Sequence, residues 1–389
     1  MDMSSKQAEP DRFSGQDTSN TVWSMATPMP RDEPLLHAPS VAASLQDMQP
    51  QNSSNRAWAP ATLQAAHAPS FGFLWSASMP RLPEFDLQGL ANISWPSTTL
   101  QAASKALFLA AENRLEKEFE PRETASREEA CRYTNHICQI VWSFSFSRCL
   151  TDELGHVLRH RLLHVGRNLD RRSPPEKAAK VIPQASHAMP AVLLRLRGIL
   201  VVHKPPGWEV DAKGQMSGTG LYLSRYIQHQ APTSQVTRLA AFEYGLVHRL
   251  DVPSSGLILA GTTFEGLALL QWQMHTYAIC REYAVLVAGC WPASRQRVSM
   301  PVQDFLSGQS FVDEHGRPAE THVKVAAHSR LSEGDGDQAS LIIVSICTGR
   351  RHQIRVHAQW QGHPTVTDEK YSQQQVIHHK IRAVQILGY

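Results

Sequence analysis

Hydrophobic positions follow two different periods along this chain. Between residues 128 and 167, apolar side chains recur three and four positions apart, which is typical of helices with one buried face. Thr151 is followed by two acidic residues, a common helix start, so this stretch predicts two helices in a hairpin. From residue 196 onward, short β-branched runs lie between glycines and prolines and predict strands.

Further helices are expected on both sides of this change. Residues 103–120 contain strong helix formers and a polar face of mixed charge. Three more helical patterns interrupt the strands, at residues 221–230, 263–277 and about 352–361. Helices between short strand runs predict an α+β fold with a largely antiparallel sheet.

Composition divides the chain into four parts. Residues 1–100 are rich in Ser, Pro, Ala and Gln without a sustained period, and we expect them to be disordered. The helical segment 101–170 and a proline-containing charged linker, 171–195, precede the α+β domain 196–389. The hairpin faintly resembles one unit of helical-repeat RNA-binding proteins. A small bundle, or an extension docked on the main domain, is favoured because solenoids need about three repeats.

Composition also narrows the class of protein. With 42% hydrophobic and 19% charged residues, the 389-residue chain can form a sizeable core. A net charge of +3 is compatible with RNA binding without requiring it. The six cysteines form no CxxC pair, which favours free thiols over a zinc ribbon or a dithiol site. Arg195 and Arg197 interrupt the best apolar run, and no targeting segment stands out, so we expect a soluble intracellular protein of unassigned compartment.

Four segments carry candidate chemistry. The first, ILVVHKPPGWEVD, starts at Ile199. The second, HRLDVPSSG, starts at His248 and places a carboxylate, Asp251, between an arginine and a turn. The third is REYAVLVAG, starting at Arg281, and the fourth is TGRRHQIRVH, starting at Thr348. Four motifs in a fixed order are much more specific than any one of them.

In this order the four segments resemble the motifs of the RluA-type RNA pseudouridine synthases, which isomerise uridine within RNA. The resemblance covers roughly the last half of the chain and leaves residues 1–195 outside. It implies a curved, mainly antiparallel mixed sheet with flanking helices. It also implies an isomerase that needs neither cofactor nor metal and acts on ribosomal or transfer RNA.

The resemblance implies three catalytic residues. Asp251 matches the family's essential carboxylate, which either attacks C1′ or removes a ribose proton; alone, it would be interpreted as a turn residue. Arg355 matches the arginine that keeps this carboxylate ionised, although an arginine can equally contact phosphate or solvent. Tyr283 matches the tyrosine that stacks on the target uracil, and the same ring can pack in a core.

Other residues are expected to bind the RNA. A uridine inside a stem must be flipped out, and Arg249 matches the residue that fills the gap it leaves. His248 is a weaker candidate, because a histidine in such a segment is often structural. The remaining predicted substrate contacts are Arg350, Arg351, His352 and Gln353. We expect RNA as the partner of a monomer, with no membrane involved.

Some features depart from the family. Ser254 replaces a threonine, and beyond Tyr371 the family's usual ending is not recognisable, so the domain is short or divergent there. This keeps open a second hypothesis, a non-catalytic RNA-binding protein derived from such an enzyme. A metal-dependent hydrolase built on His352, His357 and His363 is disfavoured, because their spacing matches no HExxH-type site and no carboxylate is placed to complete one.

Overall fold

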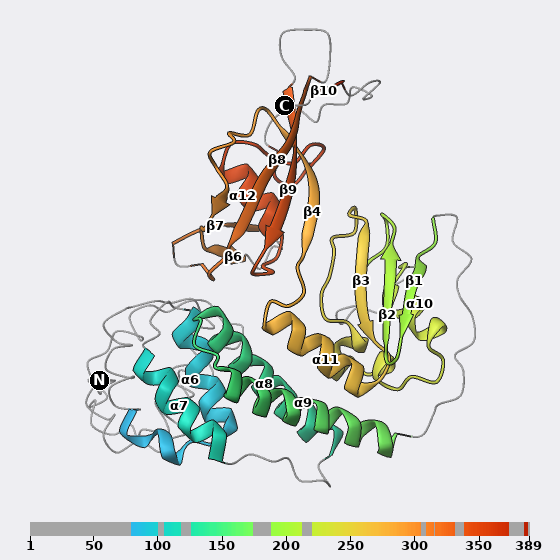
Figure 1. Cartoon of the computed structure of the whole chain (residues 1–389). Coiled ribbons are helices and arrows are strands. Elements are labelled where there is room, and N and C mark those ends of the chain that lie inside the picture. Colours follow the sequence, from blue (N-terminus) through green and yellow to red (C-terminus); the bar gives the residue numbers. More distant parts are fainter. Residues whose placement is uncertain are drawn as a thin grey trace, which may run out of the picture. The chain divides into compact units, whose positions relative to one another are not determined.

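The computed structural model describes residues 79–99, 105–117, 126–173, 188–211, 220–304, 309–314, 316–330, 338–372 and 385–387. Contacts group the described residues into two units (Figure 1). The first contains residues 79–98 and 105–278, and the second begins at Ile279. The predicted domain 196–389 therefore contributes to both units, and its boundaries stay a prediction.

The first unit begins with helices. They are a short 3-10 turn η2 (Met79–Glu84), then α6 (Leu87–Thr99), α7 (Lys105–Lys117), α8 (Arg127–Phe146) and α9 (Asp152–Arg172). Helix α6 falls inside the stretch predicted to be disordered, because Leu90, Ala91 and Ile93 become buried. The rest of that stretch, residues 1–78, lies outside the described residues.

Local signals start the two helices of the predicted hairpin. Ser126 accepts a hydrogen bond from the Glu129 backbone, and the Glu129 side chain accepts one from Ser126 N, which completes a capping box before α8. Thr151 caps α9 by accepting a hydrogen bond from Leu154 N at 3.3 Å. Both helices therefore occur where the periodicity predicts them.

Helix α9 packs against α11 (Phe264–His275), as Figure 1 shows. Gly166 makes the approach very close, since a Cβ there would lie 2.7 Å from the Cα of Glu265. Val165 and Leu169 share a buried cluster with Phe264 and with residues that precede it in the chain. The hairpin is therefore part of the hydrophobic core of the first unit.

A three-stranded antiparallel sheet completes this unit. Its order is β1 (Ala191–Leu196), β2 (Ile199–Lys204), β3 (Gly256–Gly261). In the register of β2 and β3, Lys204 pairs with Gly256. The core between this sheet and helix α10 (Leu223–Gln230) includes Val202, Trp208, Leu223 and Ile258. Two 3-10 turns, η3 (Val236–Arg238) and η4 (Ala240–Gly245), lead towards β3.

The second unit is built on a five-stranded antiparallel sheet. Its order is β10-β8-β9-β4, and β5 also pairs with β8. Helix α12 (Gln353–Trp360) contributes Ala358 to a buried cluster with Val287, Trp291 and Val344. The strands are β4 (Glu282–Ala288), β5 (Arg297–Val298), β8 (Thr321–Arg330), β9 (Gln338–Ile346) and β10 (Gln385–Leu387), with a separate hairpin of β6 (Val302–Asp304) and β7 (Ser310–Val312).

The predicted α+β class with mainly antiparallel sheets is confirmed. At the divergent C-terminal end, residues 385–387 form a strand that pairs with β8, although the sequence did not predict one. Among the described helices, none is both long and apolar enough to cross a lipid bilayer.

Candidate functional site

Asp251 lies in a turn between η4 and β3. The Ser254 backbone N–H donates to the Asp251 carbonyl at 3.0 Å and closes this turn. The Asp251 residue is partly exposed, so its carboxylate can meet a ligand without a large desolvation cost. The turn is attached to the strand before it through a buried lysine.

Lys204, at the end of β2, is fully buried. Its Nζ donates to three backbone carbonyls: Trp208 at 2.8 Å, Pro205 at 3.1 Å and Val252 at 3.3 Å. Burial lowers the pKa of Lys204 to about 8, although the charge of Asp251 acts in the opposite direction. A single ammonium group thus joins the end of β2 to the residue that follows Asp251.

The backbone around Lys204 strengthens this link. Gly207 N donates to the same Val252 carbonyl at 2.8 Å. Gly207 has a φ of +84°, in the left-handed region where a side chain would be strained. Sequence reasoning did not select Lys204, although a lysine at the end of the mostly apolar run ILVVHK was a usable signal.

The two residues before Asp251 have different environments. His248 Nε2 accepts a hydrogen bond from Leu259 N at 3.0 Å, which requires a neutral ring with its proton on Nδ1. This bond ties the segment to β3. Arg249 is exposed and has no hydrogen bond or ion pair with any described residue, so its guanidinium is available to a ligand.

In the second unit, Arg355 on α12 is held by a carboxylate. Its Nε and Nη2 donate to the two Asp368 oxygens, each at 2.7 Å, in a two-bond fork. The guanidinium carbon also lies 4.8 Å from the ring centroid of Tyr371. Burial would raise the pKa of Asp368, but hydrogen bonds from Arg355 and Thr365 outweigh it, so this pKa lies below its usual range.

This fork adds a residue that sequence reasoning missed. Arg355 was predicted to pair with Asp251, and the structure gives it an ion pair with Asp368 that was not predicted. Asp251 and Arg355 belong to different units, so their pairing stays a prediction. The missed signal was local: Asp368 lies only 13 positions after Arg355, in a turn that follows the same helix.

Tyr283 lies on β4 opposite Val344 of β9. It is partly buried and packs against the hydrophobic cluster of the second unit, as does Ile354 from α12. The core role considered for this tyrosine is therefore present. Stacking of the same ring on a uracil stays a prediction.

Gln353 is buried, and both ends of its amide are used within the fold. Its Oε1 accepts hydrogen bonds from Thr348 Oγ1 at 2.9 Å and Arg350 N at 3.0 Å. Its Nε2 donates to Glu320 O and Thr321 Oγ1, each at 3.0 Å. An amide can make about four such bonds, so Gln353 is placed to hold the loop together rather than to bind RNA.

The neighbours of Gln353 differ in availability. Arg350 Nε donates to the Pro318 carbonyl at 2.8 Å. His352 has a φ of +52°, and its Nδ1 lies 2.7 Å from the Tyr371 hydroxyl. Arg351 is exposed and makes no hydrogen bond or ion pair within the described part of the chain. Arg351 is therefore the member of this motif with the greatest freedom to contact a ligand.

The histidines considered for a metal site are bonded within the fold. His357 is buried between Thr321 Oγ1 and the Met300 carbonyl, each 2.8 Å from a ring nitrogen, and burial lowers its pKa. His363 Nδ1 lies 2.9 Å from the Ala288 carbonyl. These contacts favour structural roles for both residues.

A different group, Glu320, His322 and Cys347, has ligand atoms within 4.8 Å of one another. Arg297 already donates to Glu320 at 2.9 Å. A cation at this position would have to displace that guanidinium, so the arrangement does not favour a metal.

Comparison with known families finds a match for the segment that contains these residues. Residues 198–360 match the family model described as RNA pseudouridylate synthase. This segment is therefore similar to that family. The match starts just before β2 and ends with the last residue of α12, so it contains Lys204, Asp251, Tyr283 and Arg355. The resemblance to RluA-type RNA pseudouridine synthases is confirmed.

Several curated relatives are similar to part of this chain. The chain is 29% identical over 220 residues to "Ribosomal large subunit pseudouridine synthase C" of Vibrio cholerae, covering 56% of this chain and 64% of that protein. The protein of the same name from Haemophilus ducreyi is 32% identical over 180 residues, covering 45% and 51%. The chain thus spans about half to two thirds of the length of these relatives.

A solved structure is also similar to part of this chain. "Human RNA Pseudouridylate Synthase Domain Containing 1" aligns with 49% of this chain and 73% of its own, at 21% identity and a TM-score of 0.38.

Proposed function

We propose that this protein is an RNA pseudouridine synthase. The observation that carries the proposal is a carboxylate, Asp251, inside a synthase-family segment, on a turn attached to the fold by the buried Lys204. The names of the relatives make ribosomal RNA the first candidate substrate and leave transfer RNA as the second. The proposed catalytic domain is residues 196–389, acting as a monomer.

The proposed reaction exchanges one bond for another. The bond from C1′ to N1 breaks, the uracil turns, and C1′ joins C5; N1 ends with a proton and C5 loses one. Nothing is oxidised or hydrolysed, so no cofactor is required. In this scheme Asp251 acts at the ribose, either as a nucleophile at C1′ or as a base for a ribose proton.

The other residues have proposed roles that fit their environments. Tyr283 stacks on the detached uracil, and Arg355, oriented by Asp368, supplies a fixed positive charge near Asp251. Arg249 enters the space left by the flipped uridine, since its guanidinium is exposed and can stack. Arg351 contacts phosphate, with weaker contributions from Arg350, His352 and His248. Gln353 is left out because its amide is fully used.

The test is Asp251→Asn in the full chain, with RNA tritiated at C5 of uridine. Release of tritium should fall by about a thousandfold or more while RNA binding changes little, because the swap preserves size and removes only the charge. Asp152→Asn, the same swap at an exposed position of α9, should retain activity. An Asp251→Asn variant with substantial turnover would refute the proposal. RNA binding without any turnover by the unaltered chain would favour the non-catalytic RNA-binding protein.

A further inference from the structure

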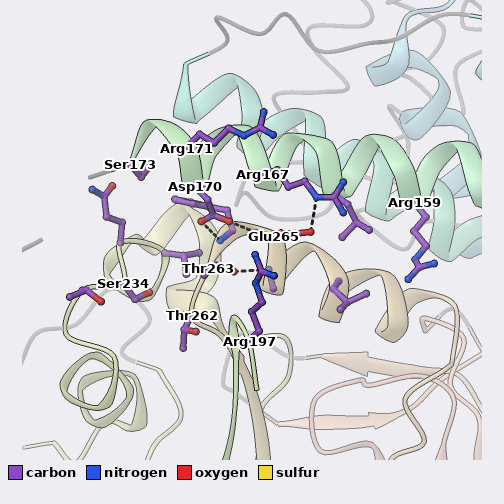
Figure 2. A pocket seen from close by; sticks show the side chains of 17 residues that line it. Arg159, Arg167, Asp170, Arg171, Ser173, Arg197, Ser234, Thr262, Thr263 and Glu265 are labelled. Atoms are coloured by element: carbon purple, nitrogen blue, oxygen red, sulfur yellow. Dashed lines mark hydrogen bonds and ion pairs between the residues drawn. The ribbon is translucent and has the colours of Figure 1, made fainter. Parts of the chain in front are cut away.

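The first unit contains a basic groove that does not include Asp251. It has a volume of about 850 Å³ and lies between α9 and the N-terminal end of α11 (Figure 2). Figure 2 shows Arg159, Arg167 and Arg171 on the helix side and Arg197, from the turn between β1 and β2, on the sheet side. Hydroxyl groups complete the lining, from Ser173, Thr233, Ser234, Thr262 and Thr263.

The arginines of α9 lie in one row along the helix. Arg159, Leu163, Arg167 and Arg171 follow one another every four residues, so they lie along one side of the helix. With a rise of about 1.5 Å per residue, the row is about 18 Å long, which is enough to follow several successive phosphates. All four groove arginines, including Arg197, are exposed.

The two carboxylates in the groove are already engaged. Asp170 accepts hydrogen bonds from Phe264 N at 2.8 Å and Glu265 N at 2.9 Å, and so caps α11 from another helix. Glu265 accepts from Arg167 Nε at 2.7 Å. The helix N-terminus is therefore not free for an anion, and binding must rely on the remaining arginines.

Those arginines are not neutralised. Arg159 and Arg197 make no hydrogen bond or ion pair with any described residue. Among the described residues, Arg171 donates only to the neutral Asn168 Oδ1, at 3.4 Å. Exposed guanidinium groups beside hydroxyl donors are the groups that contact nucleic-acid phosphates.

We propose that this groove binds the phosphate backbone of the RNA on which the protein acts. The inference rests on the proposed function, because that function supplies a polyanionic partner. A membrane surface fits less well, since helices that lie on lipid insert an apolar face. The apolar side of α9, with Leu158, Leu162 and Val165, is already buried in the protein.

The test removes three groove charges that have no acidic partner among the residues the structure describes. Full-length Arg159→Gln/Arg171→Gln/Arg197→Gln is titrated with a labelled stem-loop RNA that has a uridine-rich loop, over a range of salt concentrations. The dissociation constant should rise about tenfold or more, and the slope of log K against log salt should fall by about 2, or about 0.7 per lost contact. Circular dichroism checks that the variant is folded.

A matched control removes the same charge elsewhere in the first unit. Lys105, Arg132 and Arg148 are exposed and lie outside the groove lining, so their triple glutamine variant should bind RNA almost normally. A gain-of-charge pair complements it. Thr233→Lys adds a cation inside the groove and should tighten RNA binding. Asn135→Lys, at an exposed position of α8, should have little effect on RNA binding.

Two results would overturn this inference. One is a groove variant with the same dissociation constant and salt slope as its control triple. The other is normal RNA binding combined with lost binding to phosphatidylserine vesicles, which would assign the groove to a membrane. Both assays measure binding directly, without turnover. A chain that binds RNA through the groove but forms no pseudouridine would contradict the proposed function and leave the groove assignment intact.

Discussion

Two charged side chains, Lys204 in the first unit and Arg355 in the second, are held in opposite ways. Lys204 is fully buried and bonded to three neutral carbonyls. Arg355 is partly exposed and bonded through a fork to a carboxylate, Asp368. The first arrangement depends on the protonation of a lysine whose pKa is about 8, and the second uses a guanidinium that stays charged at any ordinary pH.

The difference shows two ways to fix a charged residue. In the first unit the cation orients a backbone turn, and the neighbouring Asp251 remains partly exposed. In the second unit the carboxylate orients the cation, so Arg355 itself is the group presented with a defined direction. Lys204 is thus a positioning residue for the turn, and Asp368 has that role for Arg355.

The largest effect is expected from Lys204→Met, which preserves the aliphatic stem and removes the ammonium. The buried carbonyls of Pro205 and Trp208 lose a donor, at about 1–3 kcal/mol each before relaxation, whereas the Val252 carbonyl keeps the Gly207 N–H. We expect about 2 kcal/mol or more of lost stability and a displaced Asp251 turn, with activity reduced about a hundredfold. Chemical denaturation and tritium release measure the two. The control is Lys324→Met, at an exposed position of β8. Equal losses of stability and activity in both variants would contradict a specific role for the Lys204 ammonium group.

The next effect tests what supports the first unit. Leu169→Ala on α9 removes a side chain that is 5% exposed and packs in the cluster with Phe264 and Leu267. We expect a loss of about 3 kcal/mol in the free energy of unfolding, because the site cannot fully collapse. Thermal and urea unfolding check this. A change below about 1 kcal/mol would indicate that the hairpin is only loosely attached to the α+β part.

A smaller effect is expected at the Arg355–Asp368 fork. Arg355→Lys and Asp368→Asn should each lower activity about tenfold and stability by about 1–2 kcal/mol. In a double-mutant cycle the two losses should not add, since both changes remove the same fork. Additive losses would show that each residue acts separately. Asp368→Asn should remain far more active than Asp251→Asn, because Asp368 only orients its partner.

A further prediction is the pH dependence that distinguishes the two cations. The pKa of Lys204 falls from 10.5 in the unfolded chain to about 8 in the fold. Between these values the unfolded state binds more protons, so stability from this group rises with pH, by at most about 1.4 kcal/mol per unit. From pH 8 upward, the unfolding free energy of the unaltered chain should therefore increase relative to that of Lys204→Met. A constant difference would contradict the lowered pKa.

The same linkage has the opposite sign at the fork. The pKa of Asp368 lies below its usual range, so its stabilisation is present above the unfolded pKa and is lost as pH falls through the folded one. Asp368→Asn should thus differ most from the unaltered chain at neutral pH and least in acid. Acid titrations of both proteins, followed by circular dichroism, measure this difference in stability. A difference that grows as the pH falls would contradict the lowered pKa of Asp368.

Much of the local structure was predictable from the sequence. The hairpin of α8 and α9 follows from apolar positions three and four residues apart and from the caps Ser126 and Thr151, each of which bonds to a backbone only three positions later. The α+β class follows from strand runs such as those of β2 and β3. The four motifs identify the segment that matches the synthase family. Helix α6 was missed because its apolar residues lie among Ser, Pro and Gln, and their burial depends on neighbours elsewhere in the chain.

The sequence by itself determined the periods, the caps and the family motifs, because each depends on residues close together in the chain. Tertiary structure decided which polar groups remain available. Gln353 lies in a binding motif but is saturated by groups brought from β8 and its own loop. Lys204 bonds to a carbonyl 48 positions later, and Asp170 caps a helix 94 positions later. A hydrogen bond requires its two atoms to lie within about 3 Å, and only the folded chain determines which distant groups meet at that distance.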